Sequence, residues 1–229
     1  MEISGVEVAA HGASVRGPRG AVFENVDLRV PAGGLLAVHG PGGSGRTSLL
    51  LTLAGRMRLS GGSVRVGRHE LPGGERRVRE LVALARAEPA VALDGGLTVS
   101  ELVAERRWME RDLTMRQIVE AFAAVGLRVR GGELVGELPA VDGLLLALAL
   151  ALAGRPAAIV VDDIDRGCPA AERARAWQAL ARVSATGCTV LAGATDPPEP
   201  LGTSPVLLEL PRPGRAARPS ASRTSEESA

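Results

Sequence analysis

The sequence contains no lysine and no tyrosine, and only 2% of its 229 residues are aromatic. All 27 basic residues are therefore arginines, and 26 acidic residues reduce the formal net charge to +1. Because the arginines are scattered along the chain and form no basic stripe, the charge pattern predicts no nucleic-acid partner. Ala, Gly, Arg and Pro are abundant instead. Since these four residues have GC-rich codons, a GC-rich bacterial genome explains the missing lysine and tyrosine.

Cysteines and long apolar runs are also scarce. The two cysteines, Cys168 and Cys188, fit no metal-site spacing, so we expect buried or half-buried apolar side chains in a reducing compartment. Residues 1–10 lack the basic and apolar regions of a signal peptide. The longest apolar run, residues 144–153, is too short to cross a bilayer. We therefore expect a soluble cytoplasmic chain that reaches a membrane only through a partner.

Hydrophobic periodicity predicts strands and helices in alternation along most of the chain. The predicted strands are residues 26–30, 35–39, 64–66, 81–85, 157–161, 189–192 and 206–210. The predicted helices are residues 47–54, 98–125 with a break near 111–112, 144–153 and 170–183. Such alternation favours an α/β fold with a parallel sheet covered on both faces. Residues 212–229 have almost nothing to bury, so we expect a disordered tail.

A glycine-rich segment between the strand 35–39 and the helix 47–54 is the strongest functional signal. It consists of Gly40, Pro41, Gly42, Gly43, Ser44, Gly45, Arg46 and Thr47, and it continues into Ser48. The segment fits the P-loop pattern G-x-x-x-x-G-K-[ST], except that arginine replaces lysine. Its glycines let backbone N–H groups turn toward phosphate oxygens, and the start of the helix adds partial positive charge. We predict that residues 40–48 bind nucleotide phosphates; the alternative is a glycine-rich turn without a ligand.

Two residues of this loop carry specific predicted roles. Thr47 offers a hydroxyl to Mg²⁺, and Arg46 would reach the terminal phosphates. Arginine is no equivalent of lysine here, because a planar guanidinium is wider than an ammonium and holds its donors in a fixed fork. The charge is kept, so we predict nucleotide binding with a less secure catalytic geometry.

An acidic pair, Asp162 and Asp163, follows the buried apolar run at 157–161. A carboxylate at the end of such a strand can hold Mg²⁺ beside a phosphate loop, directly or through water. Acidic residues at strand ends are common, so this pair alone is a weak signal. The P-loop earlier in the chain makes a metal site at this pair a stronger prediction. We predict that Asp162 and Thr47 together bind the metal, as in a Walker B and Walker A pair.

With these motifs in place, residues 6–210 resemble the ATP-binding cassette (ABC) family. Residues 97–101 (LTVSE) look like the opening of that family's helical subdomain, and residues 151–156 look like the stretch that leads into Walker B. The resemblance implies a P-loop NTPase (RecA-like) core with a mostly parallel sheet, an N-terminal antiparallel β part and an inserted α-helical subdomain. It implies a nucleotide-binding domain over residues 1–211, with the helical subdomain at about 97–140.

Five positions depart from the family's pattern. The family carries Glu after the Walker B Asp to polarise the attacking water, so the resemblance assigns this catalytic role to Asp163. Its shorter side chain withdraws the carboxylate by about 1 Å, a displacement that can cost about 10²-fold in rate. The family's signature segment aligns with Leu138, Pro139, Ala140, Val141 and Asp142, which keep only its leucine. The family's Q-loop glutamine is missing near Ala87 or Glu88, and Thr195 stands where the family has its switch histidine. The aromatic residue that stacks on adenine in the family is missing near residues 15–17.

The resemblance implies the ATP-binding subunit of an ABC transporter, with ATP and Mg²⁺ as cofactors and weak or partner-dependent hydrolysis. It implies a homo- or heterodimer with another ABC ATP-binding subunit and a membrane-embedded permease that holds the chain at the inner face of the cell membrane. A non-catalytic nucleotide-sensing or scaffold protein is the alternative, and a P-loop phosphotransferase is a more distant one.

Two structural questions stay open in the sequence. Residues 144–153 are apolar on every side, which for a helix means either deep burial or a partner-facing patch. The two tryptophans, Trp108 and Trp177, lie in predicted helices, and we expect both to be packing residues.

Overall fold

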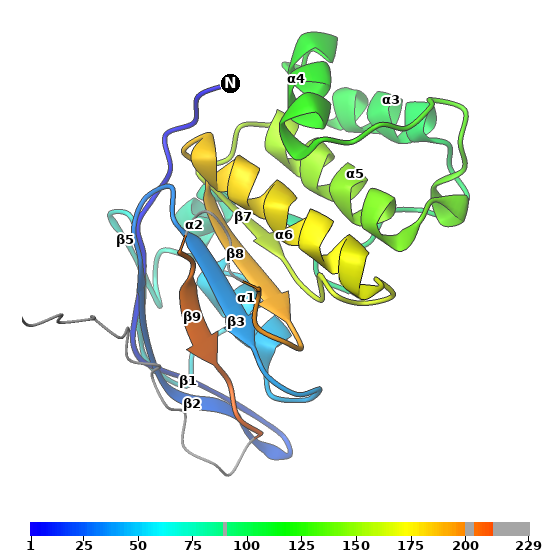
Figure 1. Ribbon diagram of the computed structural model, residues 1–229. Coiled ribbons are helices and arrows are strands. Elements are labelled where there is room, and N and C mark those ends of the chain that lie inside the picture. The colour runs from blue at the N-terminus through cyan, green and yellow to red at the C-terminus, as the bar shows by residue number, and fades with distance from the viewer. Residues whose placement is uncertain (89–90, 200–203, 213–229) are drawn as a thin grey trace, which may run out of the picture.

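Two β-sheets with helices packed on them form the computed structural model, which describes residues 1–88, 91–199 and 204–212 (Figure 1). The first sheet is antiparallel with the strand order β2-β1-β4-β5. Its strands are β1 (Val8–Gly17), β2 (Gly20–Val30), β4 (Gly61–Val66) and β5 (His69–Leu71). The second sheet is parallel with the order β6-β7-β8-β3-β9. Its strands are β3 (Leu35–His39), β6 (Val82–Arg86), β7 (Ala158–Val161), β8 (Thr189–Ala194) and β9 (Val206–Glu209).

The parallel sheet separates two hydrophobic cores. Alternate residues of β7 face opposite sides, so Ile159 packs into one core and Val160 into the other. Every residue of β7 and β8 is buried, which explains why these strands read as continuous apolar runs. The predicted α/β fold, with its antiparallel part and its parallel sheet, is therefore confirmed.

The helices cover both faces of the parallel sheet. They are α1 (Arg46–Leu53), α2 (Glu75–Leu81), α3 (Val99–Met109), α4 (Met115–Val125), α5 (Ala140–Ala153) and α6 (Ala170–Ala185), with a short 3₁₀ turn η1 (Val135–Glu137). Helix α1 is buried between the two sheets, whereas α5 and α6 pack on the opposite face (Figure 1). This arrangement leaves the start of α1 at the carboxyl end of β3, where the glycine-rich segment lies.

Capping explains the predicted break in the helical block. Thr98 and Thr114 each accept a hydrogen bond from the backbone N–H three residues later, and Glu101 and Gln117 bond back to the cap residue. These two capping boxes start α3 and α4 separately. Gly126 ends α4 in the left-handed conformation, which agrees with the predicted end of the helical block at residue 125.

The apolar helix α5 is deeply buried, which decides between the two alternatives that the sequence left open. All residues from 144 to 153 are buried, and they pack with α4, α6 and the parallel sheet. The alternative of a partner-facing patch on this helix is therefore wrong. Among the described residues, no helix is both long enough and apolar enough to cross a membrane.

Other expectations fail or lie outside the described residues. Trp177 is 5% exposed and packs in the core, but Trp108 is 79% exposed near the end of α3, so its predicted packing role is wrong. The periodicity also missed β1, β5 and α2. Strand β1 is rich in Ala and Gly, and α2 buries only Val78. Of the predicted disordered tail, residues 213–229 lie outside the described residues.

Candidate functional site

The glycine-rich loop joins the end of β3 to the start of α1, as the sequence predicted. Gly40, Gly43 and Gly45 have positive φ values of 148°, 78° and 94°. A Cβ at Gly40 would lie 2.1 Å from the Leu210 carbonyl oxygen, and one at Gly45 would lie 2.6 Å from that of Val22. The loop therefore needs glycine both for its backbone angles and for its close approach to neighbouring chain.

The loop leaves polar groups that a phosphate could satisfy. Helix α1 has no side-chain cap, so the N–H groups of its first turn point out of the helix end toward the loop. The hydroxyl of Ser44 and the Nε of Arg46 are buried and have no hydrogen-bond partner among the described residues. Buried donors without partners are costly unless a ligand or water completes them. Together with the helix end, they fit the phosphate groups of ATP.

Arg46 reaches from the loop to the acidic pair. Its side chain is only 10% exposed, with Nη1 donating to the Gly40 carbonyl and Nη2 lying 2.9 Å from Oδ1 of Asp163. The guanidinium therefore lies inside the loop with its charge paired. The residues are 117 positions apart in sequence, and sequence reasoning did not predict this ion pair.

Thr47 and Asp162, the two predicted magnesium ligands, contact each other directly. The Thr47 hydroxyl donates to Oδ2 of Asp162, while Oδ1 accepts a bond of 2.9 Å from the Asp163 backbone N–H. Asp162 is 2% exposed, and burial raises its pKa, an effect that the hydrogen bond from Thr47 partly opposes. Gly193 in β8 makes room for this carboxylate, because a Cβ there would lie 2.2 Å from Oδ1.

This pair of oxygen groups fits Mg²⁺ but does not form a complete protein cage. No cluster of three or more His, Cys, Asp or Glu side chains suited to a metal occurs among the described residues. Mg²⁺ is usually held by one or two protein oxygens, with waters and substrate phosphates completing the shell. A site built from Thr47 and Asp162 beside a phosphate loop has that composition.

Asp163 holds its carboxylate at the edge of an open depression of about 400 Å³. Its backbone is in the left-handed region, with φ of 47°. Arg86, which sequence reasoning also missed, donates to the backbone carbonyls of both Asp162 and Asp163. An arginine at the end of the β6 strand was the only available signal, and it carries no specific meaning by itself.

The positions at which the sequence analysis sought the other family motifs make ordinary structural contacts. Asp142, in the signature-like segment, is 2.7 Å from Arg175 of α6, and Ala87 pairs its backbone with Val91. The backbone N–H of Thr195 donates to Oδ2 of Asp165 at 2.7 Å. Val15, where the adenine-stacking aromatic was sought, is buried in β1. These positions therefore contribute an ion pair, a backbone bridge, a backbone hydrogen bond and a buried core side chain.

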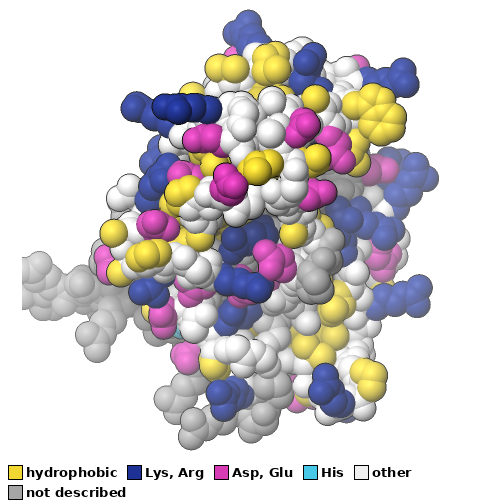
Figure 2. All heavy atoms as spheres, turned by 90° about the vertical axis from the view of Figure 1, so that its right-hand side faces the viewer, with side chains coloured by type: hydrophobic (Ala, Val, Ile, Leu, Met, Phe, Trp, Pro, Cys, Tyr) yellow, Lys and Arg dark blue, Asp and Glu magenta, His cyan; other side chains and the backbone are white. Residues whose placement is uncertain are grey.

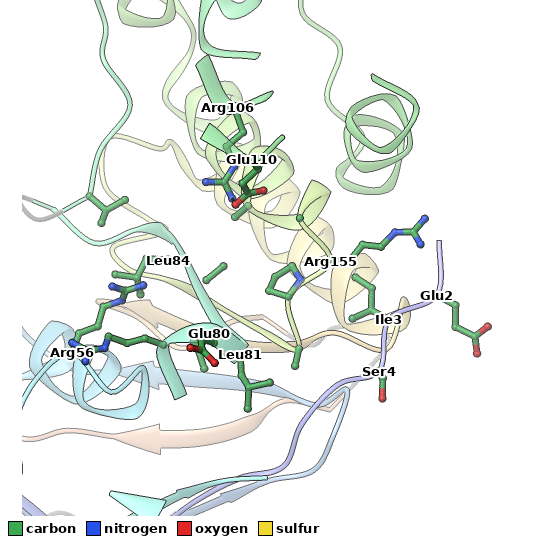
Figure 3. A pocket seen from close by; sticks show the side chains of 18 residues that line it. Glu2, Ile3, Ser4, Arg56, Glu80, Leu81, Leu84, Arg106, Glu110 and Arg155 are labelled. Carbon is green, nitrogen blue, oxygen red and sulfur yellow. Dashed lines mark ion pairs between the residues drawn. The ribbon is translucent and has the colours of Figure 1, made fainter. Parts of the chain in front are cut away.

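A separate cavity of about 600 Å³ lies at the opposite end of the parallel sheet (Figure 3). The first residues of β6 line it, as does Ala157 just before β7, whereas the glycine-rich loop follows the carboxyl end of β3. Arg106 and Glu110, which form an ion pair of 2.8 Å, lie on its upper side in Figure 3. None of the predicted site residues lines this cavity.

The surface of the chain shows no dominant charge on the face drawn in Figure 2. Basic and acidic side chains are interspersed there, and apolar side chains appear in the upper part. The exposed large apolar residues of α3 and α4 are Trp108, Met109, Met115 and Val119.

Comparison with known proteins places these features in a family. The family profile described as "ABC transporter" matches residues 23–165. The chain is 28% identical over 186 residues to the uncharacterized ABC transporter ATP-binding protein YphE of Escherichia coli K12, covering 77% of this chain and 37% of that protein. It is 34% identical over 144 residues to the aliphatic sulfonates import ATP-binding protein SsuB of the same organism, covering 62% of this chain and 52% of SsuB.

The fold has matching solved structures as well. A dimeric structure of the ATP-binding cassette MJ0796, bound to ADP and Pi, superposes with a TM-score of 0.67 at 19% identity, covering 82% of this chain and 88% of that one. At this identity the likeness concerns the fold. The chain spans about half or less of the length of the two curated relatives.

Proposed function

The chain belongs to the ABC transporter family as an ATP-binding cassette, and from this premise we propose that it binds Mg-ATP at residues 40–48 and Asp162. One observation supports this assignment above the others. Consecutive residues of the loop, Arg46 and Thr47, contact consecutive residues of the second motif, Asp163 and Asp162. The proposed phosphate-binding and metal-binding parts of the site therefore lie against each other in the nucleotide-free chain.

Each part of the proposed site has a distinct task. The backbone N–H groups of residues 40–48 would hold the phosphate oxygens, aided by the positive end of α1. Arg46 would turn its charge from Asp163 toward the terminal phosphates. Thr47 and Asp162 would hold Mg²⁺, whose bound charge offsets that of the phosphates. The direct contact between Thr47 and Asp162 counts against a scaffold that keeps the fold without a metal site.

Hydrolysis by this chain is proposed to be weak or dependent on a partner. We assign to Asp163 the task of polarising an attacking water, and ATP would first have to draw Arg46 away from its carboxylate, which Arg46 pairs at 2.9 Å in the nucleotide-free chain. Asp163 is also one methylene shorter than the glutamate of the family pattern. A general base withdrawn by about 1 Å loses rate by about 10²-fold. Thr195, at the switch position, has no imidazole to supply a second polar contact.

The partners follow from the relatives and remain proposals for this chain. SsuB is described as an import ATP-binding protein, and the MJ0796 cassette as a dimer. We propose a homo- or heterodimer with another ABC ATP-binding subunit, bound to a membrane-embedded permease at the inner face of the membrane. The cassette is proposed to occupy residues 1–211, with its helical subdomain at about 97–140.

Equilibrium binding of a fluorescent ATP analogue in the presence of Mg²⁺ tests the phosphate loop. The native chain is expected to bind at micromolar to low-millimolar concentration, and Arg46→Ala to bind at least about tenfold more weakly, since a charged hydrogen bond is lost. Arg76→Ala is the matched control, because Arg76 is 85% exposed on α2 and, among the residues that the structure describes, pairs only with Glu80. Equal binding by the native chain and Arg46→Ala, or no binding by either at several millimolar, would overturn the assignment.

A further inference from the structure

Arg86, the last residue of β6, is bound to the backbone of the acidic pair at three points. Its Nε donates to the Asp162 carbonyl at 3.2 Å, and its Nη2 donates to the Asp163 carbonyl. The Asp162 backbone N–H donates back to the Arg86 carbonyl at 2.9 Å. A guanidinium holds its donors in a fixed fork, so one side chain orients two successive peptide groups together.

A β-bulge aims the side chain at this target. The pairing of β6 with β7 is regular up to Leu84, which faces Val160, and then shifts so that Arg86 faces Val161. Such bulges bend a strand and redirect a side chain. Here the redirected side chain meets the chain as it leaves β7, at the point where the two acidic residues follow.

The segment that Arg86 holds has a conformation that needs support. Asp163 has φ of 47°, in the left-handed region that residues other than glycine seldom adopt. Such a conformation persists when surrounding bonds hold it. Besides the bonds from Arg86, the segment is held by the Arg166 N–H, which donates to the Asp163 carbonyl at 3.1 Å, and by the Ile164 N–H, which donates to the Gly193 carbonyl at 3.0 Å.

The same turn sets the direction of both carboxylates. With its carbonyl bound to Arg86, Asp163 points its side chain toward Arg46, and its N–H reaches Oδ1 of Asp162. A different φ at Asp163 would move both the carboxylate and this N–H. The position of the Asp162 carboxylate oxygens therefore depends on Arg86, whose side chain donates to the backbone carbonyls of this turn.

We propose that Arg86 is a positioning residue that fixes the left-handed turn at Asp163 and, through it, the Asp162 carboxylate that binds Mg²⁺. The metal part of this inference rests on the proposed Mg-ATP site. The clamp itself is a property of the nucleotide-free chain. A purely structural role, in which Arg86 only joins β6 to β7, makes a different prediction: all properties of the chain would weaken together.

Two variants and three readouts separate these possibilities. Arg86→Met removes all donors at similar length, and Arg86→Lys keeps one charged donor as a partial rescue. Arg65→Met is the matched control, because Arg65 is an exposed residue of β4 whose only ion pair among the described residues is with Glu7, at 3.7 Å. Hydrogen exchange of the Asp162, Asp163 and Ile164 amides is measured in the nucleotide-free chain, alongside the urea midpoint. ATP-analogue binding is measured with and without Mg²⁺.

Arg86→Met is expected to raise exchange of the three amides at least about tenfold while distant core amides change little. The factor by which Mg²⁺ tightens ATP binding should be about tenfold smaller in Arg86→Met than in the native chain. The affinity for ATP without Mg²⁺ should stay within about twofold of the native value. Arg86→Lys should lie between the native chain and Arg86→Met in the Mg²⁺ effect. If Arg86→Met does not fold, Arg86→Lys decides by the same comparison.

Unchanged exchange at the three amides, or equal loss of binding with and without Mg²⁺, would overturn the positioning role. A native chain that binds no ATP would overturn the proposed Mg-ATP site and the metal part of this inference, while the exchange data would still decide whether Arg86 holds the turn.

Discussion

The Thr47 hydroxyl donates a hydrogen bond to the buried Asp162 carboxylate, which lies 115 positions further along the chain. This contact joins the start of α1 to the end of β7 across the parallel sheet. It brings together the two oxygen groups proposed to hold Mg²⁺, next to a loop with unsatisfied buried donors.

Thr47→Val removes the donor but keeps the shape of the side chain. The buried carboxylate loses a partner, so the free energy of unfolding should fall by about 1–3 kcal/mol. The tightening of ATP binding by Mg²⁺ should also decrease. Thr52→Val is the matched control on the same helix, since its hydroxyl donates to the Ser48 carbonyl at 2.7 Å. Thr52→Val should lose a comparable free energy of unfolding and keep the tightening of ATP binding by Mg²⁺. If Mg²⁺ tightened ATP binding equally in the native chain and in Thr47→Val, the proposed role of Thr47 as a metal ligand would be contradicted.

Asp162→Asn should make the chain more stable at neutral pH. Burial raises the pKa of Asp162 above its ordinary value of 3.8, so the folded chain binds a proton more tightly than the unfolded chain does. Above the folded-state pKa the buried carboxylate is ionised and lowers stability; as pH falls through that pKa, this cost disappears. Urea unfolding from neutral pH to about pH 4 should therefore show an advantage of the variant that shrinks with acidity. A native chain more stable than the variant at neutral pH would contradict the burial effect.

Gly193→Ala should disturb the acidic pair from the neighbouring strand. The added Cβ would lie 2.2 Å from Oδ1 of Asp162 and 2.9 Å from Cδ1 of Leu50, so the strand or the carboxylate must move. Overpacking of this kind costs about 1–3 kcal/mol, measurable as a lower urea midpoint. Gly132→Ala is the control, because nothing lies within 4 Å of the Cβ it would add and its φ is not positive. Equal midpoints for the two variants would show that the carboxylate is not confined at this point.

The two tryptophans should report two environments. Trp108 is 79% exposed and Trp177 is 5% exposed, and no tyrosine contributes to the fluorescence. Removing Trp108 by Trp108→Phe should leave an emission that is blue-shifted and poorly quenched by acrylamide. Trp177→Phe should leave a red-shifted, readily quenched emission. Similar quenching of both variants would contradict the exposure of Trp108.

Much of the core fold follows from local pattern. The strand predicted at 35–39 agrees with β3. Strands β7 and β8 were predicted from their apolar residues, and these residues are apolar because both faces of each strand are covered. Strand β1 was missed because its small residues, such as Ala9 and Gly12, carry little periodicity. Pattern could not decide whether α5 faces the core or a partner. That outcome depends on which elements pack around it.

The candidate site was predictable in composition but not in its contacts. The spacing of the glycine-rich loop identified Thr47 as a candidate metal ligand. The acidic residues that follow a buried apolar strand identified Asp162 as the other candidate. The ion pair between Arg46 and Asp163 depends on a left-handed turn at Asp163 and on the reach of a guanidinium, neither of which a local pattern encodes. Arg86 contributes through bonds to backbone carbonyls, for which any sequence gives little signal.

Asp162→Asn is the variant that decides whether this chain binds ATP together with Mg²⁺. Binding of the fluorescent ATP analogue is measured for the native chain and the variant, each with Mg²⁺ and with a chelator. We predict that the native chain binds the ATP analogue several-fold more tightly with Mg²⁺ than with the chelator. The variant should bind the analogue with nearly the same affinity under both conditions. Because the variant should be the more stable protein at neutral pH, unfolding would not explain its loss. An equal Mg²⁺ effect in both proteins, or no binding by the native chain at several millimolar, would contradict the account.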